Sequence, residues 1–397
     1  MIRAVLGGLA GLALLAAPAA SLAGTKSKEF ARPPYAGAYE PQGVDERGLW
    51  MQFDEEERTI RDSPSIMRDG PLNDYVRAVL CKAVGFDRCQ ASRVYIVKDD
   101  SFNASMAPNG LMFVHKGLLA RLYSEAELAV VLGHEFAHFE LRHSLNDFRQ
   151  RRRASDAAMW IALAGIASRQ STVSLQNGII ASIFSFSRAQ ETEADLLAAA
   201  YIRGSPYKLC GGQIWKRLVQ EEDALRKERG LRKIRHIRPY VTETHPTDLQ
   251  RIAYFSVLEK EAGEDGGGGE EGIVDYRGAT TPILPELFAG LIKSNEFGAA
   301  DYVLRSRGDA MGWDGQLLAI RAELYRLRGN PRDIVTAREF FQKATTYPDA
   351  PPESWRGLGL TSLRLGQGDP GKAALAEYLK RQPEAKDAAA MKLLLEN

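Results

Sequence analysis

The stretch that decides the fold reads Glu125-Ala-Glu-Leu-Ala-Val-Val-Leu-Gly-His-Glu-Phe-Ala-His-Phe-Glu140. Its apolar residues recur at the spacing of a helix, and no proline interrupts them. Ser124 stands before the stretch and Glu127 follows three residues later, which is the capping-box pattern that starts a helix. The sequence therefore predicts a helix that begins after Ser124 and runs to about Arg149.

Two histidines on this helix could bind a metal ion. His134 and His138 are four residues apart, so they share one face and both imidazoles can reach a single metal ion. Glu135 stands next to the first histidine and can take a proton from water on the open side of that metal. The pattern H-E-x-x-H on a helix thus predicts a metal site; the alternative is a helix with two solvated histidines and a surface glutamate.

A third ligand is expected from a helix that Ser187 caps and that runs to Arg203. It contains Glu191-Thr-Glu-Ala-Asp195, in which Glu191 and Asp195 share a face while Glu193 is turned about 200° away. A carboxylate on the inner face would complete a His–His–Glu site, and Asp195 could accept the spare ring N–H of a ligand histidine. Spacing alone leaves Glu193 as a competing ligand. Such a donor set favours one zinc ion per chain, with one position left for water.

Composition and the N-terminus set the broad class. The chain has 397 residues, of which 45% are hydrophobic, and this length suggests two or three domains. A net charge of +1 gives no electrostatic case for nucleic-acid binding. Residues 1–23 have the basic start, short apolar run and small-residue end of a signal peptide cleaved near Ala23-Gly24. The alternative is a retained amphipathic anchor. Residues 24–40 are expected to be disordered.

Three cysteines fit an exported, oxidising compartment. Cys81 and Cys89 flank a short stretch that contains a turn, and we expect them to form a disulfide. Cys210 is then left over, and it is more readily a small buried hydrophobe than a reactive thiol.

The remaining elements of the first part of the chain follow from local patterns. Residues 45–61 and 72–84 are predicted helices, and a short helix is expected near 118–122. Residues 93–97 and 111–115 are predicted strands because they are rich in β-branched and aromatic residues. Residues 103–110 are expected to be a turn-rich connection between the strands.

Residues 157–186 are apolar but interrupted. Two segments, 157–167 and 179–186, are each too short to span a bilayer, and a Ser/Gln/Asn-rich stretch separates them. The simpler interpretation is two core helices joined by a loop. The alternative is a mobile flap over the metal site or a peripheral contact with a membrane surface.

A Gly/Glu-rich segment, 262–273, predicts a flexible linker and a domain boundary. Beyond it, residues 274–397 alternate short amphipathic helices with tight turns. Several of their residues have the relative offsets of a tetratricopeptide repeat, and a generic helical bundle is the alternative. The residues that match are Trp355, Leu358, Gly359, Gly366 and Pro383, with a degenerate copy at Ala322, Tyr325 and Gly329.

Three separate segments together resemble the gluzincin metallopeptidases of the CAAX-prenyl-protease and HtpX type. These are His134-Glu-x-x-His138, the downstream Glu191-x-x-Ala-Asp195, and His245-Pro246 with Arg251. The resemblance covers about residues 40–260 and is strongest to soluble periplasmic members with a C-terminal tetratricopeptide domain, the BepA-like group. It implies an α+β zincin-like metallopeptidase domain, mostly helical with a small sheet, over residues 41–261. An all-α tetratricopeptide-like helical domain would follow.

The resemblance also implies roles for individual residues. His134, His138 and Glu191 would be the zinc ligands, which favours Glu191 over Glu193, and Asp195 would support a ligand histidine. Glu135 would be the catalytic acid and base, and His245 would approach the metal as an inhibitory fourth ligand or as a transition-state stabiliser. An extended substrate would lie against a strand that contains Asn103, Ala104, Leu111, Met112 and Phe113.

These inferences predict a periplasmic zinc endopeptidase that cleaves misfolded or unassembled envelope proteins. Its C-terminal domain, residues 274–397, would dock unfolded substrates or an envelope assembly machine. The transmembrane helices of the other family branches are absent from the sequence, which argues against a prenylated substrate. A second hypothesis from another class is a chaperone or adaptor that binds through its repeats and has a dormant metal site.

Overall fold

The computed structural model describes residues 33–37, 39–163, 186–232, 249–263 and 268–396. The expected signal peptide, most of the 24–40 segment, the interrupted part of 157–186 and His245 lie outside these residues. In the part of the chain that is described, no helix is long and apolar enough to cross a membrane.

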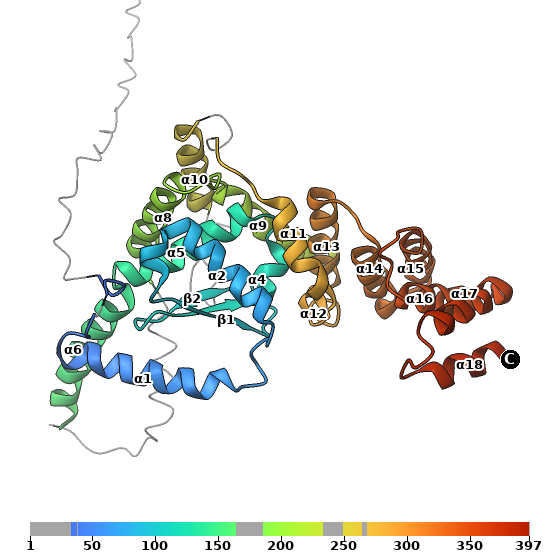
Figure 1. The fold of residues 1–397 in the computed structure, drawn as a ribbon, viewed down its shortest axis with the longest axis horizontal. Helices are drawn as coiled ribbons and strands as arrows, with labels where there is room; N and C mark the ends of the chain where they lie inside the picture. The colour runs from blue at the N-terminus through green and yellow to red at the C-terminus, as the bar shows by residue number, and fades with distance from the viewer. Residues whose placement is uncertain (1–32, 38, 164–185, 233–248, 264–267, 397) are drawn as a thin grey trace, which may run out of the picture. The chain divides into compact units, whose positions relative to one another are not determined.

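The first half of the chain consists of helices around one small sheet (Figure 1). Its elements, in order, are α1 Gly43–Arg61, α2 Gly70–Val84, α3 Phe86–Cys89, β1 Arg93–Val97, β2 Ala104–Met106, β3 Leu111–His115, α4 Lys116–Arg121, α5 Glu125–Glu140, α6 His143–Leu163, α8 Arg188–Arg203, α9 Gly211–Glu228 and α10 Leu249–Glu261. The expected combination of mostly helical structure with a small sheet is confirmed.

The sheet has the strand order β1-β3-β2, with β1 parallel and β2 antiparallel to the central β3. Because side chains alternate along a strand, each strand serves both faces. Met112 and Val114 of β3 join the main core with α2, α4 and α5, whereas Leu111 and Phe113 pack with Leu49 and Phe53 of α1 on the opposite face. Figure 1 shows α1 on one side of the sheet and α2 and α5 on the other.

One strand was not predicted. Residues 103–110 were expected to be a turn-rich connection, but Ala104–Met106 form β2. Only three residues pair, and their alternation is too short to give a period. The strand instead follows from the buried side chains of Ala104 and Met106, which pack into the main core.

Helix α5 is buried on nearly all sides, because α2, α8, α9 and β2 pack around it. Ser124 caps the helix as predicted, since the Glu127 amide donates to Ser124 Oγ over 3.1 Å, but the reciprocal half of the capping box does not form: the Glu127 carboxylate accepts from the Tyr123 amide over 2.8 Å. The first two amides of the helix, which have no acceptor within it, donate to carbonyls at the end of the Gly/Glu-rich segment. Ala126 donates to the Glu271 carbonyl over 3.0 Å and Glu125 to the Gly272 carbonyl over 3.4 Å.

The prediction that this helix continues to Arg149 is wrong. Helix α5 ends at Glu140, and α6 begins at His143. Arg142 between them has a φ of 56°, in the left-handed region that a side chain rarely adopts. Its guanidinium pairs with Glu46 of α1 over 3.4 Å and lies 5.0 Å from the ring centre of Tyr39. These contacts with the N-terminal segment stabilise a turn that the residue types at this point of the sequence do not predict.

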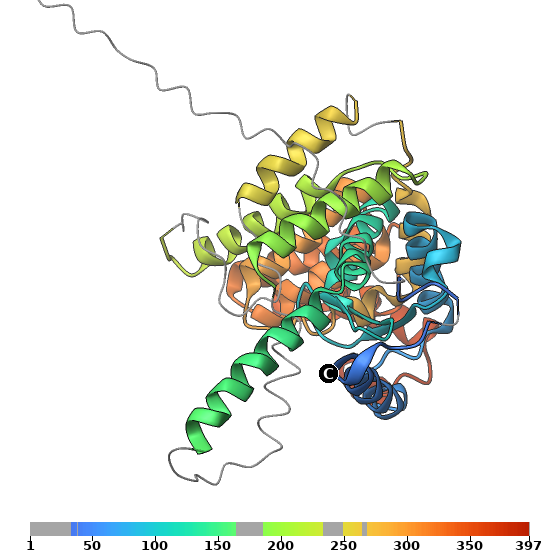
Figure 2. The same cartoon turned by 90° about the vertical axis from the view of Figure 1, so that its left-hand side faces the viewer.

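Helix α8, which carries Glu191 and Asp195, was predicted better. It is capped by Ser187 as predicted, through a capping box with Gln190, and it ends at Arg203, which Gly204 follows. It packs along α5, and α10 lies beside α9, as Figures 1 and 2 show.

The second half of the described chain is helical throughout. Its elements are α11 Ile273–Thr280, η2 Thr281–Ile283, α12 Leu284–Phe288, α13 Phe297–Met311, α14 Gly315–Arg328, α15 Pro331–Ala344, α16 Glu353–Arg364, α17 Gly368–Arg381 and α18 Ala388–Glu396. Neighbours α14 and α15, and α16 and α17, pack as pairs. The classification of these pairs as tetratricopeptide repeats stays a prediction.

The main core continues across the Gly/Glu-rich segment. Tyr276, Phe288 and Leu304 belong to the same buried cluster as α2 and α5. Arg307 of α13 is buried and donates to the carbonyl of Leu122, 3.0 Å away, at the end of α4. The domain boundary at 262–273 stays a prediction, but side chains from both sides of it stabilise one core.

Candidate metal centre

Three buried side chains on two helices converge at one point. His134 and His138 come from α5 and Glu191 from α8, and their ligand atoms all lie within 4.8 Å of one another. The two Nε2 atoms are 3.1 Å apart. Glu191 Oε2 lies 3.5 Å from His134 Nε2, and its Oε1 lies 3.6 Å from His138 Nε2.

These separations fit a zinc ion. Donors about 2.1 Å from a tetrahedral zinc lie about 3.4 Å from each other, close to the three distances found here. Two imidazoles and one carboxylate are also a donor set that catalytic zinc sites use. The residues present therefore fit the group that the sequence predicted.

A charged relay supports His134. Its Nδ1 lies 2.8 Å from Asp195 Oδ1. Arg251 of α10 holds the same carboxylate in two places, with Nε 2.8 Å from Oδ2 and Nη2 2.6 Å from Oδ1. Its Nη1 reaches Glu191 Oε2 over 3.2 Å, and its guanidinium lies 3.9 Å from the ring centre of Trp215. Asp195 thus orients the ring, and Arg251 fixes Asp195.

The electrostatics of this relay favour positive charge at the ring. Burial lowers the pKa of His134, but the carboxylates of Asp195 and Glu191 outweigh that effect and raise the pKa to about 10. A divalent cation on Nε2 would supply such positive charge in place of the proton.

His138 has different neighbours. Its Nδ1 lies 2.8 Å from Nδ1 of His143, the first residue of α6. Nε2 of His143 lies 3.3 Å from Glu193 Oε2. Phe186 stacks on the His138 ring with its centroid 3.8 Å away. Glu193, the competing ligand that spacing left open, is therefore directed to His143 and is absent from the metal cluster found among the described residues.

Glu135 lies between the two histidines in sequence and is also buried, with 3% of its surface exposed. Its charge contributes to raising the pKa of Arg251, which places this carboxylate in the electrostatic environment of the site.

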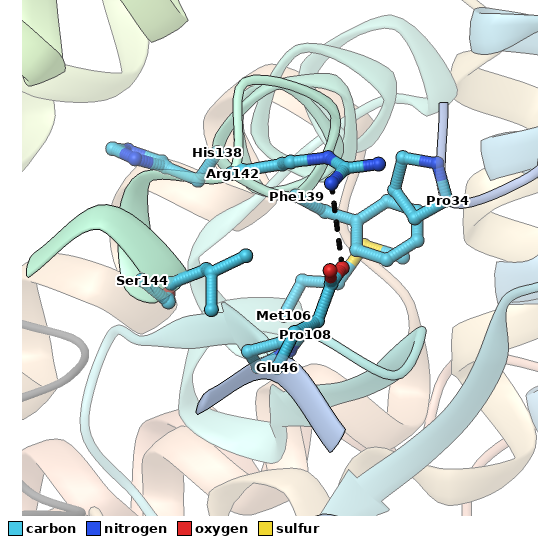
Figure 3. A pocket seen from close by; sticks show the side chains of 9 residues that line it. Pro34, Glu46, Met106, Pro108, His138, Phe139, Arg142 and Ser144 are labelled. Atoms are coloured by element: carbon cyan, nitrogen blue, oxygen red, sulfur yellow. Dashed lines mark hydrogen bonds and ion pairs between the residues drawn. The ribbon is translucent and has the colours of Figure 1, made fainter. Parts of the chain in front are cut away.

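A small cavity adjoins His138 and the sheet (Figure 3). Met106 of β2 and Arg142 line it together with His138, and the picture shows Arg142 directed to Glu46. The end of β2 thus lies close to a predicted ligand.

The predicted substrate residues have separate positions in the sheet. Leu111, Met112 and Phe113 belong to β3, which is paired on both sides by β1 and β2. An added strand cannot pair with β3, so these three residues do not form the expected substrate edge. Ala104 belongs to β2, at an edge of the sheet, and Asn103 precedes it.

The predicted cysteine pair is present as a disulfide between Cys81 and Cys89. Cys210 is free, and burial raises the pKa of its thiol well above the usual value.

Sequence reasoning missed His143 and Phe186 as neighbours of the site. His143 follows the motif by five residues, a separation that places two residues on different sides of a continuous helix. The only available signal was that it is one of six histidines in the chain.

Comparison with known proteins finds a family match over part of the chain. Residues 68–258 match peptidase family M48, a segment that contains His134, His138, Glu191 and Arg251. This segment is similar to that metallopeptidase family, so the resemblance inferred from the motifs is confirmed.

Three individual relatives are similar to parts of the chain. Over 154 residues the chain is 29% identical to a Vibrio cholerae protein assigned as a beta-barrel assembly-enhancing protease, covering 36% of this chain and 32% of that one. Over 187 residues it is 27% identical to the mitochondrial metalloendopeptidase OMA1 of Schizosaccharomyces pombe, covering 46% and 51%. The beta-barrel assembly-enhancing protease of Escherichia coli strain K12 is 23% identical over 161 residues, covering 38% and 33%. The chain thus spans a third to a half of the length of these relatives.

Proposed function

We propose that this protein is a zinc-dependent endopeptidase that hydrolyses peptide bonds of misfolded or unassembled envelope proteins. The observation that carries the proposal is the convergence of His134, His138 and Glu191 at distances suited to one zinc ion. A buried acid, Glu135, directly follows the first ligand in sequence and can take a proton from water at the metal.

The residues divide the chemistry among them. Zinc, held by His134, His138 and Glu191, would supply the Lewis acidity that acidifies water and polarises a carbonyl. Glu135 accepts the proton of the attacking water and returns it to the leaving amine. His245 is proposed to act near the metal, either as a fourth ligand at rest or as a donor to the developing oxyanion.

The edge of β2 is the proposed substrate contact. This strand pairs with β3 on one side, and its other edge has no partner strand within the described sheet. An extended chain can add there through main-chain hydrogen bonds, which require little sequence specificity. Because β2 packs against α5 and Met106 shares a cavity with His138, a bound strand would run beside the metal ligands.

The compartment and the substrates are proposed from other observations. The Cys81–Cys89 disulfide suits an oxidising compartment such as the periplasm. The names of the bacterial relatives refer to beta-barrel assembly, and we extend this to unassembled envelope proteins as substrates here. Docking of clients or of an assembly machine would then fall to residues 274–397.

A Glu135→Gln variant of the full chain tests the enzymatic proposal. Because this change removes only the proton acceptor, cleavage of an unfolded protein such as casein should fall by about 10²–10⁴-fold while zinc content stays at one per chain. Glu261→Gln, at an exposed position of α10, is the matched control and should leave both unchanged. Wild-type protein that holds zinc and cleaves no unfolded protein would contradict the proposal.

The same variant separates an enzyme from an adaptor. Deletion of residues 273–397 would also remove Tyr276 and Phe288 from the main core, so the full-length point variant is the cleaner tool. An adaptor would retain its cellular role with Gln at position 135. A His245→Ala variant then distinguishes inhibition, which predicts higher activity, from oxyanion stabilisation, which predicts loss.

A further inference from the structure

We propose that His143 and Glu193 form a hydrogen-bonded relay that fixes the ring of His138 for metal binding. Neither residue belongs to the H-E-x-x-H motif or to the ligand set, and both act through His138 as positioning residues. The proposal rests on the proposed function, because it assumes that His138 Nε2 is a metal ligand.

The relay has two links. His138 Nδ1 and His143 Nδ1 are 2.8 Å apart, a good hydrogen-bond distance, and the two ring planes are inclined by 69°. His143 Nε2 and Glu193 Oε2 are 3.3 Å apart. The side chain of His143 is 5% exposed and that of Glu193 is 58% exposed, so the relay begins in the core and ends at the surface.

The direction of the protons follows from the metal site. Nε2 of His138 faces His134 Nε2 and Glu191 Oε1, so a metal bound there requires this nitrogen without its proton. The proton of His138 is then on Nδ1 and is donated to Nδ1 of His143. His143 must carry its own proton on Nε2, and that proton is donated to Glu193. One arrangement of protons therefore satisfies all three residues, and it is the one that metal binding needs.

The break between α5 and α6 makes this contact. In a continuous helix, residue 143 would be rotated by about 140° from residue 138 and would face away from it. The left-handed turn at Arg142 restarts the chain so that His143 returns to the His138 ring. Glu46 and Tyr39 hold the Arg142 side chain and thereby stabilise the turn.

The His138 ring is also held on its face by Phe186. Stacking fixes the plane of the ring but is compatible with a 180° flip about the Cβ–Cγ bond, which would exchange Nδ1 with Cδ2 and Nε2 with Cε1. The Nδ1 hydrogen bond to His143 excludes that flip, because it directs one nitrogen and so aims the other.

The test measures zinc affinity in the full chain by competition with a chromophoric chelator. His143→Phe keeps a ring but removes the acceptor, and we expect zinc to bind 10–100-fold more weakly. His143→Asn places an oxygen near the Nδ1 position and should recover most of the affinity. His143→Gln places its polar atoms near Nε2 instead and should not. Glu193→Ala should give a smaller loss than His143→Phe.

His115→Phe is the matched control. His115 also makes a hydrogen bond through Nδ1, to Ser101 Oγ over 2.8 Å, but it lies on β3 outside the metal cluster. Zinc affinity should not change in this variant. Equal zinc affinity in folded His143→Asn and His143→Gln proteins would overturn the relay, and so would wild-type affinity in His143→Phe. A wild-type chain that binds no zinc would instead overturn the proposed function.

Discussion

The two histidines of the motif share one helix face, but the groups behind them differ. His134 is supported by Asp195 and Arg251, which are buried charges from α8 and α10. His138 is supported by His143, from the adjoining α6, and by Glu193, whose side chain is largely exposed. One imidazole therefore rests on a buried ion pair, and the other on a chain of hydrogen bonds that reaches the surface.

Because of this difference, we expect the two supports to affect the stability of the fold and zinc affinity to different extents. A buried ion pair that loses one partner leaves an uncompensated charge in the core, which destabilises the fold strongly. The relay behind His138 leaves no such charge, because its only charged member, Glu193, is exposed and water can replace it; loss of His143 leaves a neutral buried N–H of His138 unpaired, which costs about 1–3 kcal/mol. We therefore expect the His134 side to affect both folding and zinc, and the His138 side to affect mainly zinc.

The largest effect is expected for Asp195→Asn. The change removes the carboxylate that bonds the buried guanidinium of Arg251 in two places, so the longer contact with Glu191, at 3.2 Å, would have to balance its charge. The free energy of unfolding should fall by about 3–5 kcal/mol, and zinc affinity should fall by 10–100-fold. Urea unfolding in the presence of a chelator measures the first, and chelator competition measures the second.

Asp301→Asn is the control for this prediction. Asp301 pairs with Arg321 over 2.8 Å between α13 and α14, and both side chains are partly exposed. It should lower stability by a smaller amount and leave zinc affinity unchanged. If the two variants lose the same stability, the buried relay is not what distinguishes the His134 side.

The unequal support of the two histidines also marks what the sequence could predict. The histidine pair, the start of α8 at Ser187 and the shared face of Glu191 and Asp195 were predicted because they depend on spacing within single helices. The choice of Glu191 over Glu193 came from the family resemblance. The role of His143 was not predicted, because it depends on a left-handed turn at an arginine. That conformation is stabilised by Glu46, which is 96 residues away in the sequence.

The sheet gives the same lesson. β1 and β3 were predicted with the correct bounds because each is a run of β-branched and aromatic residues. The three-residue β2 was missed, and with it the fact that β3 is the central strand. Pairing between strands is a tertiary property, so the sequence pattern of β3 alone could not show that both its edges are used.

Removal of the disulfide should lower the free energy of unfolding and leave zinc affinity unchanged, which is the reverse of the effect expected on the His138 side. Cys81 and Cys89 close a loop with a sequence separation of 8, for which the chain-entropy estimate is about 2.5 kcal/mol. A Cys81→Ala/Cys89→Ala double variant should therefore lose about that much free energy of unfolding and keep wild-type zinc affinity. Cys210→Ala in the same assays controls for loss of a buried sulfur. A parallel fall in zinc affinity would mean that the metal site responds to global stability. It would contradict the claim that the two histidines are supported in different ways.

The smallest effect is expected for an ion pair of intermediate exposure, Glu57 of α1 with Arg93 of β1. The two nitrogens Nε and Nη2 of Arg93 lie 2.8 Å and 2.7 Å from the carboxylate oxygens of Glu57. Burial raises the pKa of Glu57, but Arg93 and Tyr95 outweigh it, so the pKa lies below the usual 4.5. A carboxyl whose pKa is lowered by folding stabilises the native state above its unfolded pKa, and this contribution is lost as the pH falls through its folded pKa. Because Arg93 is 39% exposed, solvent limits the contribution to about 1 kcal/mol or less.

Urea unfolding of wild type and Glu57→Gln, both with chelator, should differ at pH 7 and converge as the pH falls below 4.5. A difference at pH 7 as large as that of Asp195→Asn would show that burial does not set the size of these effects.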